Sequence, residues 1–280
     1  MATTQAPHTT AQNALKTPFV NEKFVDFSQG DNRRAMQAAL AKVRGELGRE
    51  YDLVIGGRRV KTAEKIVSRN PARPAEVVGV HASAMAEHAE MAIAAAEMAF
   101  AMWSRRPMAA RAELLFRAAT MIRERKFEFC AWLTLEVGKN WAEADADVGE
   151  TIDFLEFYAR EALRLAAAKT PIQYPGELNE LLYIPLGVGA VIPPWNFPFA
   201  IMAGMTAAAI VTGNTVVLKP SKKSQRAALH HPMGRQRCQH DRAASVHRHQ
   251  PGPRHAHGSS QRVPRSGLPS PATSGCGRRP

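Results

Sequence analysis

The chain has 280 residues, with 37 Lys and Arg against 25 Asp and Glu and a net charge of +12. Residues 222–280 contain 12 of the basic residues and one acid, Asp241, and subtracting these from the totals leaves 25 basic and 24 acidic residues in 1–221. The first 221 residues are therefore nearly neutral, which excludes them as a charge-driven nucleic-acid binder and leaves non-specific nucleic-acid binding to the basic tail alone.

Cysteine content and hydropathy indicate where such a protein works. Cys130, Cys238 and Cys276 are too few for a disulfide framework, which favours a reducing compartment. The first residues lack the apolar run of a signal peptide, and the longest apolar stretch, 199–211, is too short to cross a bilayer. We expect a cytoplasmic protein with no membrane partner.

The first elements in chain order are an arm and a helix. Residues 1–27 are polar and predict a flexible N-terminal arm. Ser28 followed by Asp31 is typical of a helix N-cap. Apolar residues then recur at helical spacing until Gly48, which ends the predicted helix; these are Met36, Leu40, Val43 and Leu47.

Short strands and then four helices follow. Residues 51–55 and 58–62 flank Gly56-Gly57 and predict a hairpin, and 66–68 and 77–80 predict two more strands of a small antiparallel platform. The predicted helices cover about 84–103, from Pro107 onward, 127–137 and 141–165. We expect their Met and Trp residues in the core, Cys130 as a buried inert thiol, and the charged run 123–126 on a solvated face.

The stretch 184–221 predicts a strand, a turn, a helix and a second strand. The apolar runs 187–192 and 215–218 are continuous, which is typical of a parallel sheet covered on both faces. Residues 193–197 form the predicted turn, and Pro198 opens the predicted helix, which ends near Gly213. Ligands of such sheets lie beyond the carboxyl ends of the strands, where this chain places Asn196 and Lys219.

Two motifs in this stretch carry a family resemblance. PWNFP at 194–198 and TGNTVVLKPS at 212–221 resemble the aldehyde dehydrogenase superfamily, and EVGKNWAEADADVGETIDFLEFYAREALRL at 136–165 resembles its 1-pyrroline-5-carboxylate dehydrogenase subgroup. The resemblance covers about 24–221. It implies an α/β fold that is the N-terminal part of an aldehyde dehydrogenase, with an incomplete Rossmann-like parallel sheet and helices, so that 28–221 form a partial NAD-binding domain.

The resemblance also implies an activity and an assembly. The family reaction is the NAD-dependent oxidation of L-glutamate γ-semialdehyde, the open form of 1-pyrroline-5-carboxylate, to L-glutamate in proline catabolism. The expected partners are the small aldehyde substrate and further copies of the chain in a homo-oligomer. In the family, the segment matching about 172–184 belongs to a strand region that pairs subunits.

Individual site residues follow from the same motifs. Asn196 matches the amide that stabilises the oxyanion, although a turn Asn can also bond its own backbone. Lys219 matches the residue that bonds the cofactor ribose, with Ser221 nearby. Three further residues are expected to line the cofactor groove, namely Ile192, Pro193 and Trp195.

Two residues of the last predicted helix are secondary candidates. Glu156 and Phe157 match a helix that lines the substrate tunnel in the family. A helix carboxylate such as Glu156 is also commonly a plain surface charge.

The match stops after Ser221, and the remaining residues have a different character. Arg, Pro, His, Ser and Gly dominate 222–280, which predicts disorder and suggests a frameshift near Ser221. Lys222 stands where many family members carry the Glu that favours NAD. The nucleophilic Cys and the general-base Glu of the family find no match, so the alternative is a catalytically inactive fragment. The tail histidines have no surrounding fold to support them, and we expect no metal site.

Overall fold

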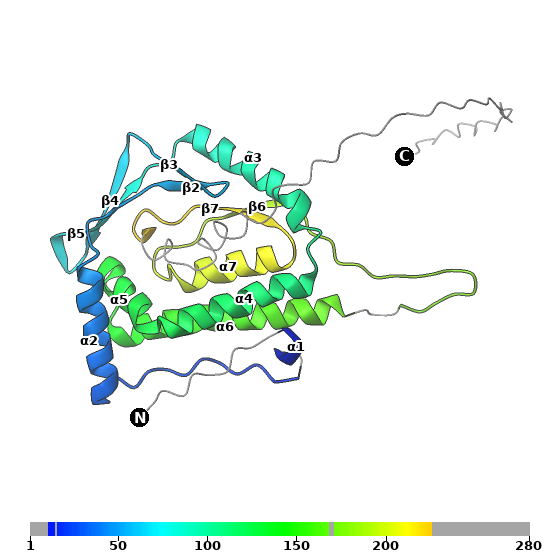
Figure 1. The fold of residues 1–280 in the computed structure, drawn as a ribbon, viewed down its shortest axis with the longest axis horizontal. Coiled ribbons are helices and arrows are strands. Elements are labelled where there is room, and N and C mark those ends of the chain that lie inside the picture. Colours follow the sequence, from blue (N-terminus) through cyan, green and yellow to red (C-terminus); the bar gives the residue numbers. More distant parts are fainter. Residues whose placement is uncertain (1–10, 15, 168–170, 226–280) are drawn as a thin grey trace, which may run out of the picture. The chain divides into compact units, whose positions relative to one another are not determined.

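The structure is a computed structural model, and it describes residues 11–14, 16–167 and 171–225 (Figure 1). The expected disorder of the tail from 226 onward, Cys238 and Cys276, and the first ten residues of the arm lie outside the described residues. The helices are α1 (Ala11–Ala14), α2 (Gly30–Arg44), α3 (Ala86–Trp103), α4 (Met108–Glu124), α5 (Lys126–Val137), α6 (Trp141–Ala166) and α7 (Ala200–Val211). The strands are β1 (Glu50–Tyr51), β2 (Leu53–Ile55), β3 (Arg58–Val60), β4 (Lys65–Asn70), β5 (Arg73–Ala82), β6 (Val188–Val191) and β7 (Thr215–Leu218).

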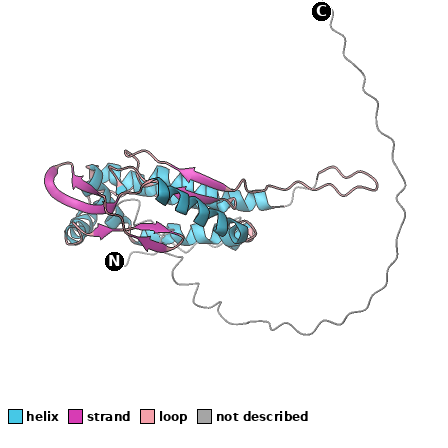
Figure 2. Ribbon diagram, turned by 90° about the horizontal axis from the view of Figure 1, so that it is seen from above, coloured by secondary structure: helices cyan, strands magenta, loops and turns pink. Residues whose placement is uncertain are grey.

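The two strands predicted in 184–221 form a parallel pair. β6 and β7 align from Val188 opposite Thr215 to Val191 opposite Leu218. Helix α3 packs against one face of this pair and α7 against the other, while α4 and α6 lie beyond α7 (Figure 1). Seen from above, along this stacking direction, helices and strands overlie one another (Figure 2). The predicted α/β arrangement, with helices on both faces of parallel strands, is confirmed.

A second sheet differs in part from the predicted antiparallel platform. β4 and β5 pair antiparallel, but β1 runs parallel to β5, so the sheet is mixed. The predicted hairpin is confirmed as β2 and β3, joined by Gly56 and Gly57 at φ of 56° and 80°. Two consecutive residues at positive φ favour glycine at both positions of this turn.

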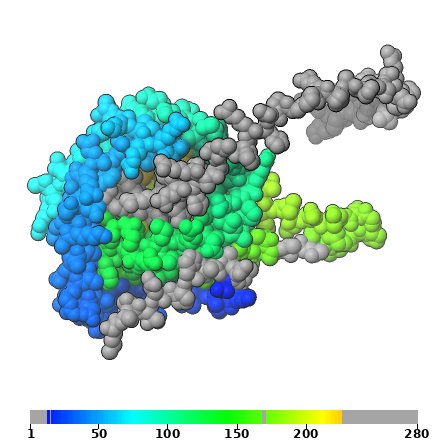
Figure 3. All heavy atoms as spheres, in the orientation of Figure 1, coloured from blue at the N-terminus to red at the C-terminus, as the bar shows by residue number. Residues whose placement is uncertain are grey.

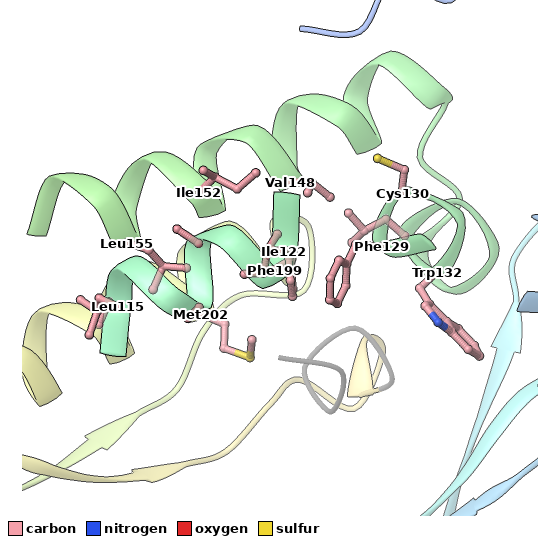
Figure 4. Close-up of a cluster of buried hydrophobic side chains, with 14 of the residues drawn as sticks. Leu115, Ile122, Phe129, Cys130, Trp132, Val148, Ile152, Leu155, Phe199 and Met202 are labelled. Atoms are coloured by element: carbon pink, nitrogen blue, oxygen red, sulfur yellow. The ribbon is translucent and has the colours of Figure 1, made fainter. Parts of the chain in front are cut away.

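Helices α4, α5, α6 and α7 share the main hydrophobic core (Figure 4). Its large buried side chains are Leu115, Ile122, Phe129, Trp132, Val148, Ile152, Leu155, Phe199 and Met202. The expectation of buried Met residues was wrong for α3, where Met98 and Met102 are exposed. Contacts of α3 with β2, β6 and β7 occupy one face of this helix, so within the described residues its other face stays open.

Two helix starts differ from the sequence-based expectation. Helix α2 follows Gln29 rather than Ser28, because the Ser28 hydroxyl donates to Asp26 Oδ1 at 2.7 Å instead of capping the helix. Helix α7 begins at Ala200, so Pro198 lies before the helix rather than opening it. Its first N–H group bonds to a side chain of α6 and needs no proline.

The expected flexible arm is held in place over residues 16–27. Asp153 of α6 accepts from the backbone N–H of Glu22 at 2.7 Å, and Asp145 accepts from Val25 N–H at 2.8 Å. The ring of Phe27 packs on Trp141 with centroids 5.6 Å apart. Acidic residues of α6 therefore dock this part of the arm, and the prediction of flexibility was wrong for it.

The charged run 123–126 is not a solvated face. Lys126 is buried with its Nζ 2.9 Å from Asp145 Oδ1, and Arg123 Nε lies 2.9 Å from Glu22 Oε2. The run falls at the junction of α4 and α5, where its cations meet the acids of the arm and of α6. The spacing of charges within one helix could not reveal partners about 20 and 100 residues away.

In the loop 171–187, the region of about 172–184 was expected to belong to a strand that pairs subunits, but no strand is assigned there. The Gln173 side-chain amide donates to Asn179 O at 2.9 Å and accepts from Asn179 N–H at 2.9 Å. This loop extends away from the rest of the described chain (Figure 3). Its apolar side chains lie open to solvent, with Leu178 83% and Ile184 79% exposed. None of the described helices is long and apolar enough to cross a membrane.

Candidate functional site

The candidate site begins where β6 and β7 end together. Because the strands are parallel, their carboxyl ends meet at one edge, and Lys219 N–H donates to Val191 O at 2.9 Å just beyond the last paired residues. Ile192 and Lys219 therefore leave the sheet side by side. Both side chains are exposed, so an apolar surface and an ammonium group face the space beyond the strands.

The turn after β6 presents Trp195 and Asn196 between two buried prolines. Pro193 and Pro198 are buried, whereas Trp195 is 49% exposed and Asn196 is exposed. Among the described residues, the Asn196 amide makes no hydrogen bond to its own turn, contrary to what a turn-closing role would require. Its NH₂ group is thus open to a ligand, as an oxyanion donor must be.

A buried ion pair supports this turn from α6. Asp147 is 0% exposed, its Oδ1 accepts from Ala200 N–H at 2.7 Å, and its Oδ2 lies 2.9 Å from Lys139 Nζ. Lys139 Nζ also lies 4.0 Å from the ring centroid of Phe197. Burial raises the pKa of Asp147 above its ordinary value, although the Lys139 charge opposes the shift.

Ser221 and the residues after it close the other side of the site. The Ser221 hydroxyl accepts from Lys223 N–H at 3.3 Å, and Lys223 Nζ lies 5.2 Å from the Trp195 ring centroid. A cavity of about 360 Å³ borders Trp195 and Lys222 and reaches buried Glu136 of α5. The site therefore carries cations where the resemblance leads one to expect a carboxylate.

Glu156 and Phe157 are not brought to this turn by any contact that the structure describes. Glu156 is buried and pairs with Arg160 at 2.5 Å and Arg123 at 3.5 Å, so it is no plain surface charge. The Phe157 ring meets Phe19 of the arm edge to face, with centroids 5.5 Å apart. Both contacts tie α6 to α4 and to the arm.

Cys130 cannot serve as the thiol nucleophile in this conformation. It is fully buried on α5, and burial, together with the nearby Asp145 charge, raises the pKa of its thiol well above the ordinary value. The expected inert thiol is confirmed. The described residues also hold no cluster of three or more metal-ligating side chains.

Lys139 and Asp147 were missed by sequence reasoning. Lys139 directly precedes the N-cap residue of α6, and Asp147 lies in the second turn of that helix, where charged side chains are usually solvated. Their spacing of eight residues matches no i,i+3 or i,i+4 pair. Asp147 is one of several acidic residues in the first turns of α6, and the sequence does not show which of them lies against the start of α7. The tertiary arrangement decides their role.

Comparison with known proteins places the chain in a family. The sequence profile of the aldehyde dehydrogenase family matches residues 59–231, more than half of the chain. The chain belongs to the aldehyde dehydrogenase family, and its fold is the N-terminal part of that family's fold.

The most informative relatives belong to one subgroup. The 1-pyrroline-5-carboxylate dehydrogenase of Geobacillus thermodenitrificans is 58% identical over 204 residues, which are 73% of this chain and 40% of that protein. The 1-pyrroline-5-carboxylate dehydrogenase 2 of Bacillus subtilis is 54% identical over 207 residues, 74% of this chain and 40% of that protein. A Thermus 1-pyrroline-5-carboxylate dehydrogenase solved with bound NAD superimposes with a TM-score of 0.73 at 50% identity, over 75% of this chain and 41% of its own. The chain thus spans about two fifths of the length of these relatives.

Proposed function

We propose that residues 28–221 are the cofactor-binding part of an NAD-dependent dehydrogenase that oxidises L-glutamate γ-semialdehyde to L-glutamate. The supporting observation is the exposed Asn196 amide in the turn after β6, at the sheet edge where Lys219 leaves the end of β7. Relatives more than 50% identical over this region are 1-pyrroline-5-carboxylate dehydrogenases, which supports the choice of substrate.

The residues at the sheet edge suit a dinucleotide. Lys219 supplies N–H donors for ribose hydroxyls, Ser221 lies two residues further on, and exposed Ile192 and Trp195 offer apolar surface. Pro193 fixes the backbone between them. NAD, when bound, accepts the hydride that leaves the aldehyde carbon.

Asn196 is assigned the electrostatic part of the chemistry. When a nucleophile adds to the aldehyde carbonyl, charge develops on the oxygen, and an amide N–H aimed at that oxygen stabilises it. Loss of one such donor costs about 10²–10³ in turnover in other enzymes. Glu156 and Phe157 remain candidates for the tunnel wall, in which case the ion pairs of Glu156 would fix the wall rather than touch substrate.

Binding and turnover are separable in this chain. No thiol among the described residues can attack the aldehyde, so we propose that the 280-residue polypeptide binds NAD without reducing it. Equilibrium dialysis with NAD and with NADP, followed by an assay of NADH formation with the semialdehyde, tests both parts. We expect saturable binding that falls at least about tenfold in Lys219→Met, and no NADH.

Three outcomes overturn parts of this proposal. Absence of saturable binding to either cofactor excludes a cofactor-binding role for the chain. Preference for NADP assigns the Lys222 and Lys223 cations to a 2′-phosphate and replaces NAD as the cofactor. NADH formation excludes the inactive-fragment alternative.

We further propose that the chain associates with copies of itself through the exposed apolar loop, in the region 172–184, and works in the cytoplasm. The apolar side chains of this loop support the first part, and the low cysteine content supports the second. Size-exclusion chromatography with light scattering tests the assembly, and a monomer at micromolar concentration contradicts it.

A further inference from the structure

We propose that Lys139 and Asp147 form a clamp that positions the turn carrying Trp195 and Asn196. This role rests on the proposed function, since it concerns the turn that presents the oxyanion donor and the cofactor groove. Both residues act through other groups, and neither faces a ligand directly. They are therefore positioning residues.

The first half of the clamp is the carboxylate of Asp147. One oxygen accepts from Ala200 N–H at 2.7 Å, at the first residue of α7, and Phe199 N–H also bonds to this carboxylate. These N–H groups have no partner within α7, and the helix terminus carries positive potential that a buried carboxylate neutralises. The start of α7 is thereby fixed to α6.

The second half of the clamp is the ammonium of Lys139. Its Nζ lies 2.9 Å from the other Asp147 oxygen and 4.0 Å from the Phe197 ring centroid, within range of a cation–π interaction. Phe197 directly follows Asn196. The ammonium therefore links the capped helix to the exposed turn, and Lys139 itself is held in place after the left-handed Gly138 that ends α5.

A third contact joins the end of the turn to α5. The Phe199 ring stacks on Phe129 of α5 with centroids 4.8 Å apart (Figure 4). Residues 197–200 are thus bound on two sides by side chains from α5, α6 and their junction. The exposed residues of the turn need no hydrogen bonds of their own to keep one position.

The chain offers a matched control on the same helix. Lys126 and Asp145 form another buried ion pair at 2.9 Å, and Asp145 likewise accepts a backbone N–H at 2.8 Å, from Val25. This pair holds the arm and not the turn. Lys139→Met and Lys126→Met both leave a buried carboxylate without its ammonium, so they share any general cost of that change.

The test is hydrogen exchange combined with NAD dialysis on the full chain. In Lys139→Met we expect the Phe199–Ile201 amides to exchange at least about tenfold faster and NAD affinity to fall by a similar factor. Lys139→Arg should restore most of both. In Lys126→Met we expect faster exchange at Glu22–Val25, with the start of α7 and NAD affinity unchanged.

The proposal fails if Lys139→Met leaves the first amides of α7 protected, or if Lys126→Met exposes them equally. If the unmodified chain does not bind NAD, the proposed function fails while the exchange data still decide the clamp. If Lys139→Met does not fold, Asp147→Asn keeps an oxygen for Ala200 N–H and removes the charge pairing. The Phe199–Ile201 amides must then exchange faster in Asp147→Asn than in Asp145→Asn.

Discussion

The burial of Cys130 predicts that its thiol reacts slowly with alkylating reagents. Its thiol is fully buried and its pKa is raised, chiefly by burial, so little thiolate forms at neutral pH and reagents cannot reach it. We expect iodoacetamide at pH 8 to leave Cys130 unmodified in the folded chain and to label it after unfolding in guanidinium. Mass spectrometry of the peptide that contains Cys130 separates it from the other two cysteines. Labelling in the folded chain at the rate of a free thiol contradicts the prediction.

The raised pKa of Asp147 predicts how the stability of the fold depends on pH. Burial raises its pKa in the folded state above the ordinary value of 3.8, so its contribution to stability is present at low pH and is lost as pH rises through the folded pKa. Lys139 opposes this shift, and Lys139→Met removes that opposition. We therefore expect the variant to lose about 3–5 kcal/mol at pH 8 and less at pH 5, measured by urea unfolding.

Neighbouring groups require a control for this pH dependence. Glu150 on α6 and Cys130 on α5 both respond to the Asp147 charge. The double variant Lys139→Met/Asp147→Asn retains these groups but has no carboxylate at 147. Its stability relative to the unmodified chain should vary much less with pH. An equal pH dependence in the single and double variants assigns the effect to the other groups.

At the scale of elements, the close approach of α7 to α6 depends on Gly204. A Cβ at this position would lie 2.9 Å from Cδ2 of Phe154, whose ring stacks on Tyr158 with centroids 5.6 Å apart. Because a stacked ring cannot move without disturbing its neighbour, we expect Gly204→Ala to cost about 1–3 kcal/mol in urea unfolding, despite the higher helix propensity of Ala.

Gly30→Ala is the matched control for that substitution. Gly30 also lies in a helix, but its added Cβ would meet only the terminal Nη1 of Arg34 at 3.3 Å, which can move aside. This variant should be neutral or slightly stabilising. If Gly204→Ala has the same effect as Gly30→Ala, α7 does not pack on Phe154 as described.

The elements predictable from the sequence were those whose causes are local. The β2–β3 hairpin follows from two adjacent glycines, and β6 and β7 follow from continuous apolar runs that are typical of parallel strands. In the site, Asn196 and Lys219 followed from their place after these strands. Their roles in a reaction rest on the family motif and remain predictions.

The features that sequence reasoning missed depend on contacts between distant segments. The capping of α7 by Asp147 spans 53 residues, and the docking of the arm on Asp153 spans 131. The burial of Lys126 likewise depends on an acid of another helix. The Ser28 cap is an exception, because its hydroxyl bonds to Asp26 only two residues away, and the sequence offers both partners without showing which one is used.

At the scale of the whole molecule, the parallel sheet formed by β6 and β7 is small, and one of its edges is exposed. Among the described residues it has two strands, and the chain spans about two fifths of those relatives. Apolar surface at Ile192, Trp195 and Phe197 lies open at its carboxyl edge. The described residues leave this apolar surface uncovered.

For the molecule as a whole, we predict that copies of the chain associate through the loop 171–187. Leu178, Leu182 and Ile184 are exposed. The charged residues of this segment are Glu177 and Glu180. Burial of each such side chain against another copy contributes about 1.5–3 kcal/mol. Substituting all three by Ser should therefore weaken self-association at least about tenfold in sedimentation velocity experiments.

A second triple variant makes this prediction specific to the loop. Met91, Met98 and Met102 are also exposed, but they lie on the outer face of α3. If general apolar exposure drives association, replacing these methionines by Ser weakens it as much as the loop variant does. If the loop carries the contact between copies, the α3 variant associates like the unmodified chain and only the loop variant associates more weakly. The second result is expected, because the loop extends away from the rest of the described chain (Figure 3) and can reach another copy without disturbing the core.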